Sequence, residues 1–282
     1  MPELPEVEVL VRHLRPLLRN QTIRAITVRR AKVLLPTSAP TFRRVLRGAK
    51  FISLSRRGKY LLFELRGESD RQPLQLMGHL GMTGRMYLAR RSQALPKHAA
   101  VVFALGRGNF IYEDPRYFGR LTLDISSATK LGPEPLSEAF TVKAFGLALR
   151  RSRQAIKVKL LDQTSVAGIG NIYASEALFR ARISPKRSAA RLSAAQVVRL
   201  RQTIRAVLRE AIACGSTLPL SFGGGRAGLF YFGRTAGTPD YYEERLRVYD
   251  RAGLPCAVCG TSIKRIVQAA RSTFYCPNCQ RG

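Results

Sequence analysis

Acidic residues are scarce in this chain of 282 residues, because 18 Asp and Glu stand against 48 Lys and Arg, for a formal charge of +30. The basic residues extend from Arg12 to Arg281 and do not form a single tail. An excess of this size indicates a polyanionic partner, and nucleic acid is the first candidate.

The sequence also lacks any apolar stretch long enough to span a bilayer, and it has no lipidation motif. A basic segment followed by an apolar run, which is typical of a secretory signal, is missing from the N-terminus. Hydrophobic residues still make up 45% of the chain, enough for two domains with cores of their own. We therefore expect a soluble cytoplasmic protein with no membrane partner.

Cysteine is rare, yet four of the five cysteines form two CxxC pairs. Cys256 and Cys259 make the first pair, and Cys276 and Cys279 make the second. Two such knuckles on a β-hairpin can place four thiolates tetrahedrally, which zinc prefers; a rubredoxin-like iron centre is the alternative. A closed site of this kind is structural, so one zinc ion is expected to fold the module and not to catalyse.

The first half of the chain has the pattern of a β-sandwich or barrel. Short β-rich runs punctuated by Gly and Pro extend from Ile23 to about Leu123. Before them, Pro5 suits the first turn of a helix, apolar residues recur at helical spacing to Leu18, and Pro16 is expected to kink or end that helix. Two glycine-containing segments, 78–84 and 113–119, are predicted to be shaped loops.

The second half is predicted to be helical, which makes the fold class α+β. A linker at 131–137 separates a domain at 1–130 from a helix-two-turn-helix domain at 138–245, and the zinc finger occupies 246–282. Ser193 is a candidate N-cap for a helix to about Ala213. The glycine-rich segment at 216–240 lacks the Gly-Lys-Ser/Thr ending of a phosphate-binding loop, so a loop without a nucleotide is predicted.

The N-terminus carries a possible covalent catalyst. If Met1 is removed, Pro2 presents a secondary amine that can attack a sugar carbon and form an iminium ion. Glu3 can then act as the proton donor. The partial positive charge of the following helix N-terminus disfavours protonation of the amine and keeps it nucleophilic.

Taken together, these features resemble the bacterial formamidopyrimidine-DNA glycosylase family over nearly the whole length. The motifs that carry the resemblance are PELPEVE at 2–8, RRGKYL at 56–61, HLGMTG at 79–84, EDPRYFG at 113–119, GIGNIYASEALF at 168–179 and RSTFYCPNC at 271–279. The resemblance implies a monomeric, bifunctional glycosylase and abasic-site lyase. Its partner would be double-stranded DNA with damaged bases or abasic sites, and its substrates oxidised purines such as 8-oxoguanine and formamidopyrimidines.

The resemblance also assigns chemical roles. It implies that Pro2 attacks C1′, that Glu3 supplies the proton for sugar opening, and that Glu6 organises the site. Lys59 resembles the family lysine of β-elimination and phosphate contact, and Arg271 the arginine of δ-elimination. A cation beside each departing phosphate stabilises the charge that develops there.

Three further residues match family positions that act when the damaged base leaves the helix. Met82, Arg116 and Phe118 would fill the vacated space and wedge the duplex. A flexible apolar side chain, a hydrogen-bond donor for the orphaned base and an aromatic ring suit that task, which must offset a few kcal/mol of unstacking.

Other matches fall on expected DNA contacts. His98 corresponds to a DNA-binding position, as Arg116 does, and His79 is a candidate phosphate contact. Asn171 begins the second helix of the two-turn motif, where backbone N–H groups and the side chain can hold a phosphate. Arg153 lies near a basic family position, although Ser152 is an alternative alignment.

One segment departs from the family pattern. The serine-leucine-arginine-aspartate-phenylalanine-like run that usually follows the long helix is replaced by residues 216–222 and an apparent insertion to Asp240. Because the family's lesion-sensing loop lies there, base preference stays open. The alternatives are an oxidised-pyrimidine glycosylase of the endonuclease VIII type and a non-catalytic zinc-ribbon DNA-binding protein.

Overall fold

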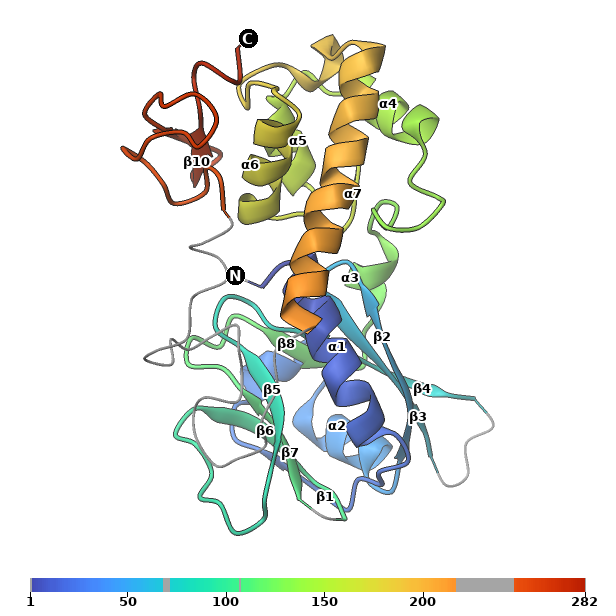
Figure 1. The fold of residues 1–282 in the computed structure, drawn as a ribbon. Coiled ribbons are helices and arrows are strands. Elements are labelled where there is room, and N and C mark those ends of the chain that lie inside the picture. The colour runs from blue at the N-terminus through green and yellow to red at the C-terminus, as the bar shows by residue number, and fades with distance from the viewer. Residues whose placement is uncertain (1, 68–71, 107, 217–245, 282) are drawn as a thin grey trace. The chain divides into compact units, whose positions relative to one another are not determined.

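The computed structural model describes residues 2–67, 72–106, 108–216 and 246–281 (Figure 1). These residues separate into two compact units, one from the N-terminus to Thr129 and one that contains Lys130 to Cys214 together with the C-terminal segment. Met1 and the predicted lesion loop beyond Ser216 lie outside the described residues.

The first unit is a β-sandwich, as predicted. Two four-stranded antiparallel sheets have the spatial orders β1-β6-β7-β5 and β2-β3-β4-β8. Phe63 of the second sheet lies 5.8 Å, between ring centroids, from Phe110 of the first. Their apolar inner faces therefore form one core. The strands span Ala25–Val28 (β1), Lys50–Arg57 (β2), Tyr60–Arg66 (β3), Leu74–His79 (β4), Arg85–Ala89 (β5), Ala99–Ala104 (β6), Asn109–Glu113 (β7) and Arg120–Thr122 (β8).

Helix α1 (Leu4–Leu18) packs against β2 and β3. Its apolar residues at helical spacing are buried in the same core: Val7, Leu10, Val11, Leu14 and Leu18. The helix continues through Pro16 and ends two residues later, so the proline costs only a hydrogen bond of the last turn. The remaining helical elements of this unit are η1 (Ala31–Leu34), α2 (Ala39–Leu46) and α3 (Ser126–Thr129).

The predicted loop at 78–84 is partly wrong, because Gly78 and His79 belong to strand β4. Gly78 is therefore part of the ladder with Leu61 of β3, and its Cα lies against the Met86 side chain, where an added Cβ would lie 2.8 Å from the flexible Cε atom. The loop proper begins at Leu80. It places Met82 at an exposed position between β4 and β5.

The second unit begins with helices whose apolar sides are buried. They are α4 (Val142–Arg150), α5 (Ile156–Leu161), α6 (Asn171–Arg180), η2 (Ala189–Arg191) and α7 (Ala194–Ser216). The Ser193 hydroxyl accepts the Gln196 N–H at 3.3 Å, which confirms the predicted N-cap of α7. No helix in the described part of the chain is long and apolar enough to cross a membrane.

A β-hairpin of β9 (Lys264–Gln268) and β10 (Arg271–Tyr275) completes this unit. Its turn consists of Ala269 and Ala270, both with positive φ. The buried Glu176 of α6 anchors the chain that enters this segment, because its carboxylate accepts the N–H groups of Arg247, Val248 and Tyr249 at 2.9–3.0 Å. The C-terminal module is therefore fixed to α6 by a charged acceptor.

Candidate functional site

The start of α1 is held by a reciprocal capping box. Glu3 is the N-cap residue, and its backbone N–H donates to Glu6 Oε2 at 2.8 Å while its carboxylate faces the backbone of Glu6. Pro2, Glu3 and Glu6 are all buried. Because Glu3 follows Pro2 directly, the Glu6 carboxylate fixes the backbone on which the predicted nucleophile and proton donor are mounted.

Lys59 lies in the tight turn between β2 and β3, and its side chain is buried. Gly58, at φ +57°, makes this turn possible. Arg56 connects the turn to α1, since its guanidinium donates to the Gly58 carbonyl at 3.0 Å and to Glu8 Oε2 at 2.9 Å. The strand turn that carries Lys59 and the helix that follows Pro2 are thus connected by one arginine.

Glu8 stays ionised in this arrangement. Burial raises the pKa of its carboxyl, but the hydrogen bonds and charges of Arg12 and Arg56 outweigh burial and hold the pKa below its ordinary value. The ion pair is half-buried, because 9% of the Arg56 side chain and 19% of the Glu8 side chain are exposed. The link between α1 and the lysine turn is therefore electrostatic.

His79 ends β4 directly opposite Tyr60 in the register with β3. Burial lowers its pKa to about 4, and the charges of Lys59 and Arg120 act in the same direction. Its Nδ1 accepts the Gly81 N–H at 3.1 Å, which assigns the proton of the neutral ring to Nε2. At neutral pH the ring can offer a phosphate a hydrogen bond but no charge.

Met82, Arg116 and Phe118 lie on two loops of the first unit and are exposed, Met82 by 43% and Phe118 by 54%. The Arg116 guanidinium carbon lies 4.8 Å from the centroid of the Phe118 ring. A cation and an aromatic ring thus form one projecting pair. His98 is half-buried just before β6, and its carbonyl accepts the Asp114 N–H at 3.1 Å.

In the second unit, Asn171 is the first residue of α6, as predicted, but its side chain is engaged inside the protein. Its Oδ1 accepts from Lys157 Nζ at 2.9 Å, and its Nδ2 donates to the Ser272 carbonyl at 2.8 Å. Lys157 is fully buried and also donates to Ser175 at 2.9 Å and to Thr273 at 3.4 Å. These bonds join α5, α6 and β10, the strand that begins with the exposed Arg271.

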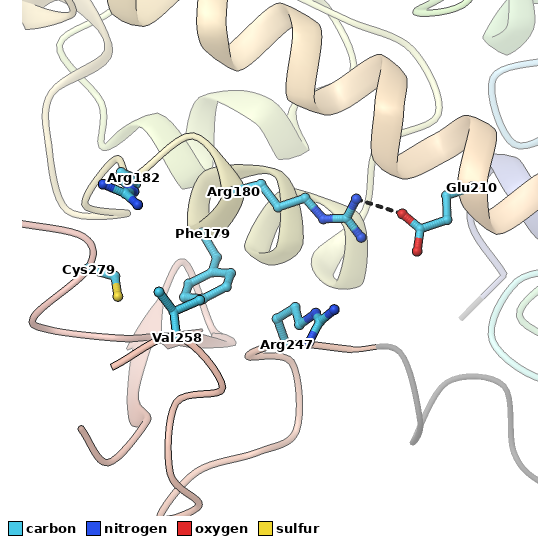
Figure 2. A pocket seen from close by; sticks show the side chains of 7 residues that line it. All are labelled: Phe179, Arg180, Arg182, Glu210, Arg247, Val258 and Cys279. Carbon is cyan, nitrogen blue, oxygen red and sulfur yellow. Dashed lines mark hydrogen bonds and ion pairs between the residues drawn. The ribbon is translucent and has the colours of Figure 1, made fainter. Parts of the chain in front are cut away.

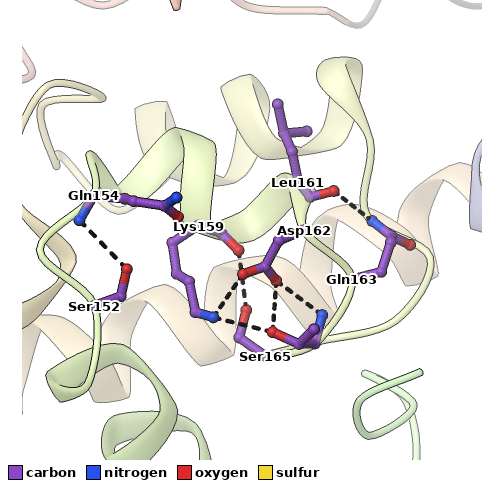
Figure 3. Close-up of polar contacts among 8 residues, drawn as sticks. Ser152, Gln154, Lys159, Leu161, Asp162, Gln163 and Ser165 are labelled. Atoms are coloured by element: carbon purple, nitrogen blue, oxygen red, sulfur yellow. Dashed lines mark hydrogen bonds and ion pairs between the residues drawn. The ribbon is translucent and has the colours of Figure 1, made fainter. Parts of the chain in front are cut away.

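The two turns before α6 are shaped by side chains (Figure 3). Lys159 pairs with the Asp162 carboxylate at 2.6 Å, and that carboxylate also accepts the Thr164 N–H. Gln163, at φ +65°, donates to the Ile169 carbonyl at 2.6 Å and accepts the Gly168 N–H at 2.8 Å. The turn is therefore closed before Asn171 begins the helix.

The two alignments proposed near α5 differ in exposure. Arg153 is exposed. Ser152 is half-buried, and its hydroxyl accepts the Gln154 N–H at 3.3 Å in Figure 3. Of the two side chains, the arginine is therefore the more accessible.

The four paired cysteines meet in space, with all Sγ atoms within 4.8 Å of one another. Three of the Sγ–Sγ distances are 3.4, 3.5 and 3.9 Å. A tetrahedral zinc ion with bonds of about 2.3 Å requires about 3.8 Å. Backbone N–H groups of Val258 and Cys279 also point to ligand sulfurs at 3.4 Å. The cysteines Cys256, Cys259, Cys276 and Cys279 are positioned to bind one zinc ion.

Comparison with known proteins finds relatives that match this chain over its whole length. Family models match residues 1–121 (formamidopyrimidine-DNA glycosylase N-terminal domain), 131–220 (its H2TH domain) and 253–282 (zinc finger found in FPG and IleRS). Formamidopyrimidine-DNA glycosylase of Paracoccus denitrificans is 42% identical over 297 residues, with 100% of both chains covered. The chain belongs to the formamidopyrimidine-DNA glycosylase family.

Solved structures of the family have the same fold. Formamidopyrimidine-DNA glycosylase of Thermus thermophilus is 39% identical with a TM-score of 0.81, covering 99% of this chain and 98% of that one. The Lactococcus lactis enzyme bound to DNA with an abasic site is 33% identical with a TM-score of 0.85, covering 99% and 100%. The same enzyme bound to DNA with an oxidised pyrimidine is 35% identical with a TM-score of 0.85, covering all of both chains.

The sequence did not predict three charged residues whose hydrogen bonds hold the segments that carry the predicted site residues. Arg56 stands next to the lysine turn, Asp114 is fully buried in the second loop, and Lys157 is fully buried under α6. Two of them lie inside quoted motifs, and Lys157 lies in none. These side chains can hold backbone segments in place because they are buried, and the sequence does not predict that a charged residue is buried.

A pocket of about 430 Å³ lies in the second unit (Figure 2). The pocket is basic, because three arginines line it together with one acidic residue, Glu210, which pairs with Arg180 at 2.6 Å. None of the predicted catalytic residues line it; the pocket instead includes the zinc ligand Cys279. Its lining residues are Phe179, Arg180, Arg182, Glu210, Arg247, Val258 and Cys279.

Proposed function

We propose that the protein excises oxidised purines from double-stranded DNA and cleaves the strand at the resulting abasic site. The observation that carries the proposal is the capping box, in which the Glu6 carboxylate holds the Glu3 N–H at 2.8 Å. It fixes the residue next to Pro2 at a helix N-terminus, whose positive end keeps an amine there nucleophilic. Family membership and the basic charge point to the same substrate.

In the proposed reaction, the Pro2 amine attacks C1′ of the damaged nucleotide and the base departs. Glu3 gives a proton to the sugar as its ring opens, which leaves an iminium ion at C1′. The iminium acidifies C2′, so the 3′ phosphate and then the 5′ phosphate leave by successive elimination. Lys59 would stabilise the first departure and Arg271 the second.

The remaining predicted residues would hold the duplex, with the protein acting as a monomer. Met82, Arg116 and Phe118 are exposed, as residues that enter DNA must be. His98, Arg153 and the neutral His79 would contact the backbone. At Asn171 the helix N-terminus would do so in place of the side chain, which is engaged by Lys157 and Ser272.

Borohydride trapping on duplexes with 8-oxoguanine opposite cytosine, an oxidised pyrimidine or a plain abasic site tests this proposal. We expect a covalent adduct with 8-oxoguanine, and cleavage that leaves phosphate at both ends. Pro2→Gly, which replaces the secondary amine by a less nucleophilic primary one, should slow formation of the adduct strongly, whereas Pro5→Ala, a change of a buried proline inside the first turn of α1, should leave its rate unchanged. An undiminished Pro2→Gly adduct would refute the assignment of the nucleophile.

Oxidised pyrimidines are a second candidate substrate class. The Lactococcus lactis enzyme, similar to this chain over its whole length, was solved with DNA that contains an oxidised pyrimidine. Excision of the pyrimidine lesion at a rate equal to that of 8-oxoguanine would establish dual specificity. Tight binding with no adduct on any substrate would instead indicate a non-catalytic DNA-binding protein.

A further inference from the structure

The two loops that carry Met82, Arg116 and Phe118 meet at one buried carboxylate. Asp114 is fully buried in the first unit. Its Oδ1 accepts from the Thr83 hydroxyl at 2.7 Å and from the Arg116 N–H at 3.2 Å. Its Oδ2 accepts from the Gly119 N–H at 2.9 Å.

This carboxylate does more than close its own loop. The bonds to Arg116 and Gly119 shape residues 114–119, but Thr83 belongs to the other loop and directly follows Met82. The Asp114 N–H also donates to the His98 carbonyl at 3.1 Å. One residue therefore has hydrogen bonds to three separate segments, each of which carries a predicted DNA contact.

The backbones of the two loops also interlock. Gly81 has φ +61°, and a side chain there would lie 2.6 Å from the Gly119 nitrogen. A side chain at Gly119 would in turn lie 2.4 Å from the His79 carbonyl oxygen. Because the backbones approach this closely at both glycines, a hydrogen bond between the loops can set their relative position.

Tyr112 adds a further hydrogen-bond donor to this site. Its hydroxyl donates to Asp114 Oδ2 at 3.4 Å, and its ring is fully buried. Burial raises the pKa of the phenol, and the Asp114 charge raises it further, so the hydroxyl stays a donor at every physiological pH. Hydrogen bonds to a carboxylate in such surroundings are among the stronger ones.

We propose that Asp114 is a positioning residue that acts through Thr83 to hold Met82 in register with Arg116 and Phe118, so that the three side chains enter the duplex as one unit. The inference rests on the proposed function and adds to it the source of the geometry for base extrusion. Neither Asp114 nor Thr83 needs to touch DNA for this role.

Thr83→Val tests the link, because it removes the hydroxyl and keeps the shape. Single-turnover release of 8-oxoguanine from a duplex should slow about tenfold or more, the effect of one lost hydrogen bond to a buried charge. Cleavage of an abasic site in a single strand needs no vacated space to be filled, so its rate should stay within about twofold. Thr83→Ser should restore the duplex rate.

Thr122→Val is the matched control, because Thr122 is buried in β8 and its hydroxyl bonds to that of Thr37 at 2.8 Å. It should leave the ratio of the duplex to the single-strand rate unchanged. In a Met82→Ala background, Thr83→Val should add no further loss, since the link then has no side chain to position. An additive loss, or equal slowing on both substrates, would overturn the inference.

A binding readout separates this inference from the proposed function. 2-Aminopurine placed beside an abasic site in a duplex should brighten when the wild-type protein opens the base stack, and brighten less with Thr83→Val. This measurement needs no cleavage. A wild-type protein that opens the stack but cleaves nothing refutes the proposed function alone, whereas an equal fluorescence change in both proteins refutes the role of Asp114.

Discussion

Replacement of the buried Lys157 by methionine gives the sharpest test of how the second unit is assembled. The change keeps the length of the side chain and removes the ammonium group. Lys157 Nζ lies 2.9 Å from Asn171 Oδ1, 2.9 Å from Ser175 Oγ and 3.4 Å from Thr273 Oγ1. Lys157→Met therefore withdraws a donor from three acceptors at once, two in α6 and one in β10.

The magnitude follows from which partners can adapt. Ser175 already donates to the Asn171 carbonyl at 2.9 Å and retains that bond. The Asn171 Oδ1 atom, in a half-buried side chain, and the buried Thr273 Oγ1 atom both lose a charged donor, at a cost of about 1–3 kcal/mol. Methionine also removes the desolvation cost of burying an ammonium group, and this gain offsets part of the free energy lost with the hydrogen bonds. We expect a net destabilisation of about 2 kcal/mol.

The assay is thermal unfolding of the zinc-loaded protein. A loss of about 2 kcal/mol should lower the Tm of the second unit by roughly 4–8 °C. Lys143→Met, the same change at an exposed position of α4, should shift the Tm by less than about 1 °C. Because β10 loses an anchor near Arg271, the δ-elimination product should also fall relative to the β-elimination product. A Tm for Lys157→Met equal to that of Lys143→Met would refute the reasoning.

Four other predictions can be tested directly. His79 should titrate by NMR with a pKa of about 4 in the free protein, and a midpoint near 6.5 would contradict this. Because the folded state binds fewer protons than the unfolded state between these two pKa values, a free energy of unfolding on the order of 3 kcal/mol should be lost as pH falls from 6.5 to 4. The depressed pKa of Glu8 gives stability that is present above pH 4.5 and lost as pH falls through the folded pKa, so Glu8→Gln should flatten the acid side of a urea-unfolding profile. Both alanines of the β9–β10 turn have positive φ, so Ala269→Asn combined with Ala270→Gly should raise the free energy of unfolding of the second unit by about 1 kcal/mol, measured by denaturant unfolding. No gain would mean that the turn is unstrained. Cys276→Ser should reduce bound zinc, measured by atomic absorption, from one ion per chain to almost none and abolish DNA binding, whereas full metal content would contradict the four-thiolate site.

Much of the fold could be predicted because local chemistry and tertiary structure agree. The spacing of the CxxC pairs already specifies four ligands, and the structure brings all four sulfurs together. Apolar periodicity and Pro5 located α1 correctly. Strand β4 was missed where Gly78 suggests a loop, because pairing with β3 decides the backbone conformation there. Tertiary packing overrides the turn signal of a glycine.

The candidate site divides in the same way. The motifs predict roles for Pro2, Glu3 and Lys59, and the structure shows that all three residues are buried in the first unit. The engagement of Asn171 could not be predicted, because its partners Lys157 and Ser272 are distant in sequence. An asparagine at a helix start is typical both of a phosphate contact and of an internal bridge. The arrangement in space alone distinguishes the two.

Each unit orients its exposed residues through a buried charge. Asp114 binds two loops in the first unit, and Lys157 binds α5, α6 and β10 in the second. A charge excluded from water is stable only while its hydrogen bonds are satisfied, so its partners are held to a narrow geometry. An exposed arginine side chain that contacts DNA can reorient at small cost. The backbone that carries it cannot reorient in this way, because the buried charge holds it in place. Substitutions at these buried residues should therefore impair DNA repair more than most substitutions on the basic surface.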